Sequence, residues 1–131
     1  MPPSTGQRVT EEFAVSEETV EQFGAASTDR NPVHFDEAYA AATPFKTRIA
    51  HGMLTASFVS AVLGNTLPGP GTIYLSQTLK FRAPVHIGDT VRVEVEVLEY
   101  DEQRRGTRLA TRAFVGDTLV LDGEAKAIAP A

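Results

Sequence analysis

The stretch from Asp29 to His34, together with His51-Gly52 further along the chain, holds the side chains best suited to chemistry. A carboxylate and an imidazole can take a proton from water and return it, and a backbone amide at the start of a helix can bind a developing oxyanion. Asn31-Pro32 is a turn dipeptide, and proline disfavours helical backbone in the residue before it. We therefore expect a bend with Asp29 and His34 on either side of it.

Each of these residues also has a structural interpretation. Asp29 could cap the turn into Asn31-Pro32, and His34 could be a structural histidine with satisfied hydrogen bonds. Gly52 could serve the close packing of a helix. His51 could line a site or only hydrogen-bond near the helix start, and the structural role is favoured. The residues by themselves leave these alternatives open.

Composition excludes several other kinds of site. A chain of 131 residues is expected to form a single domain, residues 1–131. A formal net charge of -5 and the lack of a basic block argue against nucleic-acid binding. With no cysteine and three separated histidines, the sequence predicts no metal site. We also expect no cofactor and no membrane association. Residues 1–7 contain no apolar segment of the kind found in secretory signals, which favours the cytoplasm.

Helical patterns dominate the first half of the chain. After a short strand over residues 9–15, a helix is expected from a cap at Ser16 to about Ala26, and a second over residues 36–42 with Asp36 as its cap. Residues 50–63 are apolar or small on every side, which predicts a helix buried all round. Gly64 ends that pattern below the roughly 20 residues that a membrane span needs.

Strand patterns dominate the second half. Residues 73–81 alternate, which predicts one strand with one face toward the core, made of Ile73, Leu75, Leu79 and Phe81. Residues 91–97 place valine at every second position, and strands over 107–115 and 118–128 flank a hairpin turn at Gly116-Asp117. This order indicates an α+β fold in which one antiparallel sheet curls over one buried helix. So few strands leave exposed edges, which a second copy of the chain could cover.

Several segments carry a resemblance to a known family: residues 29–36, 49–54, 73–75 and 81–85, with Gly88-Asp89. In order and through nearly the whole chain, they resemble the MaoC-like (R)-specific enoyl-CoA hydratases, and in particular the short, single-domain bacterial enzymes that supply polyhydroxyalkanoate synthesis. The resemblance implies the hot dog fold and a homodimer with the active site at the subunit interface. It also implies reversible syn addition of water to trans-2-enoyl-CoA, giving (R)-3-hydroxyacyl-CoA.

The same resemblance assigns roles to individual residues. Asp29 and His34 match the catalytic pair, and the Gly52 amide matches the oxyanion hole. Asn31 would orient the bend or the histidine. The substrate-binding positions of this set are Asn31, His51, Ser60 and Leu63, of which Ser60 and Leu63 would shape the acyl pocket. Arg48, Lys80 and Arg82 are candidates for the CoA phosphates, although for any one of them an ordinary solvated surface is the favoured explanation.

Two other functions compete with the hydratase. A dehydratase acting on a 3-hydroxyacyl group carried by acyl carrier protein would use the same residues. A non-catalytic acyl-CoA-binding subunit would keep the fold, but loss of the aspartate or the histidine would be expected there, and both are present. A thioesterase of this fold would not need the pair. Acyl chain length and carrier are not determined by the sequence.

Overall fold

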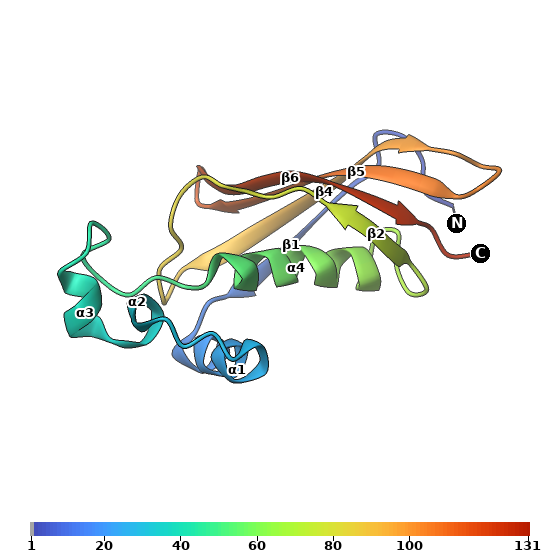
Figure 1. Cartoon of the computed structure of the whole chain (residues 1–131). Helices are drawn as coiled ribbons and strands as arrows, with labels where there is room; N and C mark the ends of the chain where they lie inside the picture. Colours follow the sequence, from blue (N-terminus) through green and yellow to red (C-terminus); the bar gives the residue numbers. More distant parts are fainter. Residues whose placement is uncertain (1) are drawn as a thin grey trace.

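A single curved sheet and one central helix organise the chain, as Figure 1 shows for a computed structural model that describes residues 2–131. Six strands form an antiparallel sheet in the order β1-β4-β5-β6-β2, with β3 paired to β6. The elements are β1 (Arg8–Ala14), α1 (Glu17–Ser27), α2 (Pro32–Phe35), α3 (Glu37–Ala41), α4 (Gly52–Asn65), β2 (Ile73–Gln77), β3 (Lys80–Phe81), β4 (Thr90–Tyr100), β5 (Gly106–Val115) and β6 (Thr118–Ile128).

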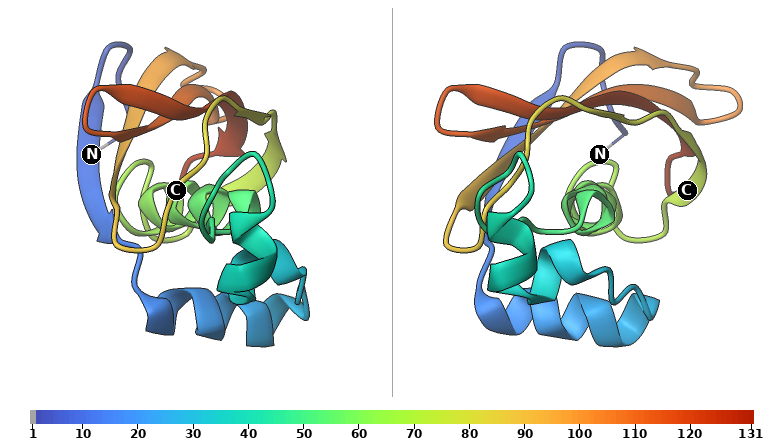
Figure 2. Two further views of the ribbon diagram at one scale, coloured as in Figure 1. Left: turned by 90° about the vertical axis from the view of Figure 1, so that its left-hand side faces the viewer. Right: turned by 60° about the vertical axis from the view of Figure 1, so that its left-hand side comes forward.

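The sheet arches over α4, and α1 lies on the side of α4 away from the sheet (Figure 2). This is the hot dog arrangement that the resemblance implies. Among residues 2–131, no helix is long and apolar enough to cross a membrane.

The core forms where the valine stripe of β4 meets α4. Val91, Val93, Val95 and Val97 are all fully buried, as the strict alternation predicts. Burying each such side chain contributes about 1.5–3 kcal/mol relative to leaving it exposed. The packing therefore fixes α4, and with it the start of that helix at Gly52, against the centre of the sheet.

The predicted caps and turn are confirmed. Ser16 accepts a hydrogen bond from the Thr19 amide at 3.0 Å and so begins α1. Asp36 accepts from the Tyr39 amide at the same distance and begins α3. Gly116 has a φ of 59°, which the β5–β6 hairpin turn requires and which glycine adopts without strain.

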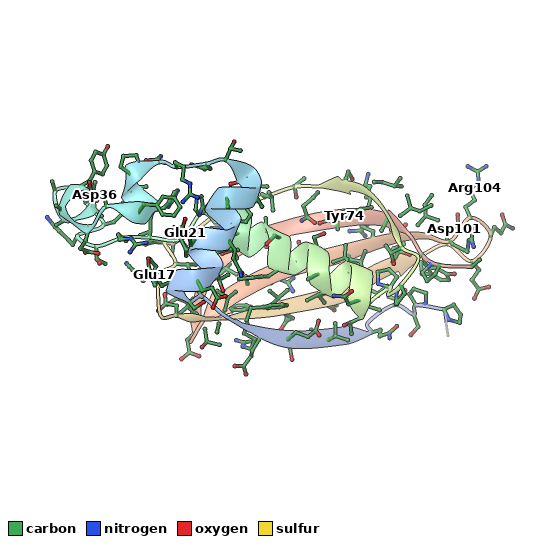
Figure 3. The ribbon with its side chains drawn as sticks, turned by 90° about the horizontal axis from the view of Figure 1, so that it is seen from below. Glu17, Glu21, Asp36, Tyr74, Asp101 and Arg104 are labelled. Atoms are coloured by element: carbon green, nitrogen blue, oxygen red, sulfur yellow. The ribbon has the colours of Figure 1, made fainter. Side chains whose placement is uncertain are left out.

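Two predictions about burial are wrong. Helix α4 is not buried all round, because Met53, Ser57 and Ser60 are exposed in the single chain. The sheet covers one side of α4, and α1 does not extend over the whole of the other side (Figure 3). An uncharged sequence indicates that a helix avoids water, but it does not say which neighbour covers each face.

The predicted strand over residues 73–81 is divided into β2 and β3. Of its apolar side chains, only Leu79 packs against the core of the single chain. Ile73, Leu75 and Phe81 are 56%, 59% and 54% exposed. Strand β2 lies at one edge of the sheet, where the described chain supplies no further layer to cover it. Alternation identifies two faces of a strand but not which of them is covered.

The packing of α4 gives a first prediction. Leu63 is 1% exposed and belongs to the core, whereas Ser60 is on the exposed face of the same helix. Leu63→Ala should lower the free energy of unfolding by about 2–5 kcal/mol, because it leaves a cavity. Ser60→Ala should change it by less than about 0.5 kcal/mol. Denaturant titration measures both, and equal effects would contradict this assignment of the two faces.

Candidate active site

The bend before α2 is built by two side-chain caps. Asp29 accepts a hydrogen bond from the Asn31 amide at 3.1 Å, and Asn31 accepts from the Val33 amide at 3.3 Å. Pro32 occupies the first helical turn, where its missing N–H costs nothing. The turn-capping role considered for Asp29 is therefore real, but it engages only one oxygen of the carboxylate. Asn31 orients the bend, as the resemblance implies.

His34 projects from α2 and is 8% exposed. Its Nδ1–H donates to the carbonyl oxygen of Ile49, with Nδ1 and O 2.7 Å apart. A carbonyl oxygen can only accept, so the proton of the neutral ring lies on Nδ1 and Nε2 carries a free lone pair. This is the tautomer that can accept a hydrogen bond from water or a proton.

Burial lowers the pKa of His34 below its ordinary value of 6.5. The hydrogen bond to Ile49 and the charge of Asp29 raise the pKa of His34, whereas the charges of His51 and Arg48 lower it further. The net result favours the neutral imidazole near pH 7.

His51 supports both members of the candidate pair. Its Nε2–H donates to the backbone oxygen of Asp29 at 3.0 Å, and its ring stacks on that of His34 with centroids 3.9 Å apart. The side chain is 2% exposed, with Phe23 and Phe35 against it. The favoured structural role of His51 thus agrees with its contacts, and its ring also lines the cavity described next.

A cavity of about 490 Å³ joins Asp29, His34 and Gly52. Gly52 is the first residue of α4, where amide groups have no partner within the helix. A Cβ at Gly52 would lie 2.7 Å from the Phe81 ring, so close packing also requires glycine here. Both interpretations of Gly52 are therefore compatible. The remaining lining includes Phe45, Met53, Thr55, Phe81 and Arg82.

A second cavity, of about 500 Å³, lies between α4 and β2. Ser60 lines it, and Met53 lines both cavities. Tyr74 of β2, which is labelled in Figure 3, also lines it, and burial raises the pKa of its hydroxyl. Leu63 lines neither cavity but lies in the core. Its predicted contact with substrate stays a prediction.

The three basic candidates for CoA phosphates differ in their surroundings. The prediction that Arg48 binds the CoA phosphates is corrected. Both of its terminal nitrogens bind Glu17, and its side chain is only 15% exposed, so it is not a free cation at the surface. Arg82 lines the first cavity and lies 3.5 Å from Asp122. Lys80 is exposed on β3. Arg82 and Lys80 stay candidates.

The fold brings together residues that are separated in the sequence. One donor atom each from Asp29, His34 and His51 lies within 4.8 Å of the others. Two imidazoles and a carboxylate are also a donor set that zinc sites use. The wide spacing of the histidines along the chain was therefore a poor reason to expect no metal site. That the chemistry needs no metal stays a prediction. His86, by contrast, is 40% exposed and lies at the surface.

Comparison with known proteins identifies the family of this chain. The MaoC like domain matches residues 2–119. The chain belongs to the MaoC-like family. This MaoC-like chain is 59% identical over 111 residues to a 3-hydroxybutyryl-CoA dehydratase from Methylorubrum extorquens, covering 85% of this chain and 71% of that protein. It is 48% identical over 126 residues to an (R)-specific enoyl-CoA hydratase from Rhodospirillum rubrum, covering 96% and 88%.

A solved structure extends the comparison to the fold. The (R)-hydratase from A. caviae involved in PHA biosynthesis superimposes with a TM-score of 0.94 at 43% identity, over 98% of both chains. The predicted family and the hot dog fold of this MaoC-like protein are thereby confirmed.

Three residues of the site make contacts that the sequence did not indicate. Phe81 packs against Gly52, Met53 lines both cavities, and Arg48 binds the backbone of His34. Alternation placed Phe81 on the strand face directed at the central helix, but nothing in the sequence pairs it with Gly52. The ion-pair partner of Arg48 lies in a different element, so no local pattern indicates it.

The contact between Gly52 and Phe81 gives a second prediction. Gly52→Ala should lower the free energy of unfolding by about 1–3 kcal/mol more in the native background than in a Phe81→Ala background. The Phe81→Ala change removes the ring that the new methyl group meets. The free energies of unfolding of the two single variants and the double variant measure this coupling. Strict additivity would show that the ring moves aside freely.

Proposed function

We propose that this MaoC-like protein is an (R)-specific enoyl-CoA hydratase, a hydro-lyase that adds water reversibly to trans-2-enoyl-CoA. The observation that carries the proposal is the meeting of the Asp29 carboxylate and the neutral His34 imidazole in one cavity at the start of α4. The names of its relatives, a hydratase and a 3-hydroxybutyryl-CoA dehydratase, describe the two directions of such a reaction. A non-catalytic binding subunit has no need of this pair.

The two side chains divide the work on water. A water molecule between Asp29 and His34 would give one proton to the Asp29 carboxylate as its oxygen forms the bond to C3 of the enoyl group. The pair then returns one proton to C2, so water is added across the double bond without other reactants. Because oxygen and proton come from the same side, the addition is syn. A general base of this kind contributes about 10²–10⁴ in rate.

The enolate that forms between these steps needs a hydrogen-bond donor. The Gly52 amide opens the 14-residue helix α4, whose N-terminus favours negative charge. We assign this amide to the thioester oxygen, where charge develops in the transition state. The absence of a side chain leaves room for substrate to approach.

Acyl specificity is proposed to lie in the second cavity. Ser60 and Met53 line it, and it adjoins the catalytic cavity at Met53. A longer acyl chain would have to pass this methionine. We propose that Arg82, which lines the first cavity, binds the charged end of the substrate. We base three further proposals on family similarity: CoA as the carrier, a role in supplying polyhydroxyalkanoate synthesis, and a cytoplasmic location. The proposed mechanism uses no cofactor or metal.

We further propose that the protein acts as a homodimer. Met53, Ile73, Leu75 and Phe81 are each more than half exposed, and Ile73 and Leu75 belong to the edge strand β2. A second copy related by a two-fold axis would cover these side chains and the unpaired edge. Asp29 is exposed in the single chain, and the same partner would enclose the catalytic cavity.

The third prediction tests catalysis. Asp29→Asn should lower the rate of crotonyl-CoA hydration by about 10² or more, because the amide cannot accept the proton from water. The variant should fold normally, since an asparagine oxygen can still cap the turn through the Asn31 amide. Loss of the conjugated enoyl absorbance measures the rate.

Asp117→Asn, on the exposed β5–β6 turn, is the matched control and should keep the native rate. A native rate in Asp29→Asn would remove Asp29 from the mechanism. The native protein could instead leave crotonyl-CoA and longer enoyl-CoA esters unchanged and convert the corresponding acyl carrier protein thioesters. That result would show that the acyl group is carried by acyl carrier protein and not by CoA.

The fourth prediction tests the dimer. Sedimentation equilibrium should give about twice the 14.1 kDa chain mass, and Leu75→Glu should shift the mass towards that of one chain, because a buried charge without a partner is costly. Gln103→Glu adds the same charge on the exposed β4–β5 turn, between the labelled Asp101 and Arg104 of Figure 3, and should leave the dimer intact. A monomeric native protein would refute the proposal.

A further inference from the structure

Arg48 connects α1 to the bend that carries His34. Its Nε–H donates to the backbone oxygen of His34 at 2.7 Å. Its two terminal nitrogens donate to the two carboxylate oxygens of Glu17, at 3.0 and 2.8 Å. All three nitrogens of the planar guanidinium are therefore engaged in one fixed geometry, which lysine cannot reproduce. Glu17 lies in the first turn of α1, where the helix dipole also favours its charge.

The residues next to Arg48 hold the same bend. The Ile49 amide donates to the Val33 oxygen at 3.3 Å, and the Ile49 oxygen accepts from Nδ1 of His34. Thr47 donates its hydroxyl to Glu37 at 2.6 Å. The backbone oxygen and the ring of His34 are thus bound to two consecutive residues, 48 and 49. Any movement of Arg48 would shift both attachments of the histidine.

We propose that Arg48 is a positioning residue for His34, and that Glu17 serves as its counter-charge. The role rests on the proposed catalytic function of His34, since the geometry matters for turnover only if that imidazole handles a proton. Arg48 does not touch the reacting atoms. It fixes the backbone from which His34 projects into the cavity, and its charge acts on the ring through a distance that the ion pair with Glu17 holds constant.

The charge of Arg48 lowers the pKa of His34, and the carboxylate of Glu17 is paired with that charge. The groups that face the ring are Asp29, whose charge raises its pKa, and His51 and Arg48, which lower it; burial and the Ile49 oxygen complete the environment. Removing the positive charge in Arg48→Gln should therefore raise the pKa of His34. Removing the compensating carboxylate in Glu17→Gln leaves Arg48 unpaired and should lower that pKa further. Both changes break the same ion pair.

The fifth prediction uses this opposition. Nitrogen-15 NMR titration of the three histidines should show the pKa of His34 moving up in Arg48→Gln and down in Glu17→Gln. Glu18→Gln, the neighbouring residue on α1 whose carboxylate binds Gln22, is the matched control and should move it in neither direction. Glu17 is 65% exposed at its side chain, so Glu17→Gln should fold even if Arg48→Gln does not. His34→Asn assigns the resonance.

Kinetics provide the second readout. Arg48→Gln should lower kcat for crotonyl-CoA by up to about 10²-fold, the cost of a misplacement near 1 Å, with little change in KM. Arg48→Lys keeps the charge but not the three-nitrogen geometry, so it should leave the pKa of His34 near its native value while kcat still falls. Histidine titration in both Arg48 variants and the kcat and KM of all variants form the complete test.

Two results would overturn the proposal. Shifts of the His34 pKa in the same direction in Arg48→Gln and Glu17→Gln would show that the ion pair has only a structural role. A raised KM with unchanged kcat in Arg48→Gln would show that Arg48 binds the CoA portion. The titration is made on the free protein, so opposite shifts in a protein that hydrates no enoyl thioester would support the positioning role and refute the proposed function.

Discussion

The hydrogen bond from Nδ1 of His34 to the Ile49 oxygen joins the two segments from which the site is built. One segment is the capped bend that carries Asp29, and the other leads into α4 at Gly52. The bond fixes the ring's orientation and its tautomer together, because a carbonyl oxygen can only accept a hydrogen bond, so Nδ1 must carry the hydrogen. Stacking of His51 on His34 and the bond from His51 to the Asp29 oxygen complete the connection. The chemistry proposed for this site depends on a few contacts between short loops rather than on the sheet.

The sheet contributes by holding α4 still. The valine stripe of β4 packs on one side of the helix, and this fixes the helix start beside the bend. The opposite side of α4 and the edge strand β2 expose apolar side chains. Burial on one side and exposure on the other are the features that a two-fold partner would exploit. In this arrangement, stability of the chain and access to the site are controlled by different faces of one helix.

Arg48 illustrates why residue type alone is a poor guide to role. An arginine near the opening of a site for a phosphorylated substrate suggests a phosphate contact, but here the guanidinium binds Glu17 and a backbone oxygen. This largely buried guanidinium holds two segments together, and its charge lowers the pKa of His34. Arg48 thus both binds the backbone of His34 and lowers the proton affinity of the His34 ring.

The sequence by itself determined the elements that depend on local rules. Caps at Ser16 and Asp36, the turn at Asn31-Pro32, the alternating valines and the hairpin at Gly116 follow from side-chain hydrogen bonds, backbone preferences and periodicity within a few residues. The motifs over residues 29–36, 49–54, 73–75 and 81–85, with Gly88-Asp89, together indicated the family. Contacts between distant segments determine the rest: the exposed side of α4, the exposure of Ile73 and Leu75, the contact of Phe81 with Gly52, and the partner of Arg48. A periodic pattern says that a face avoids water, whereas packing of separate segments decides what covers it.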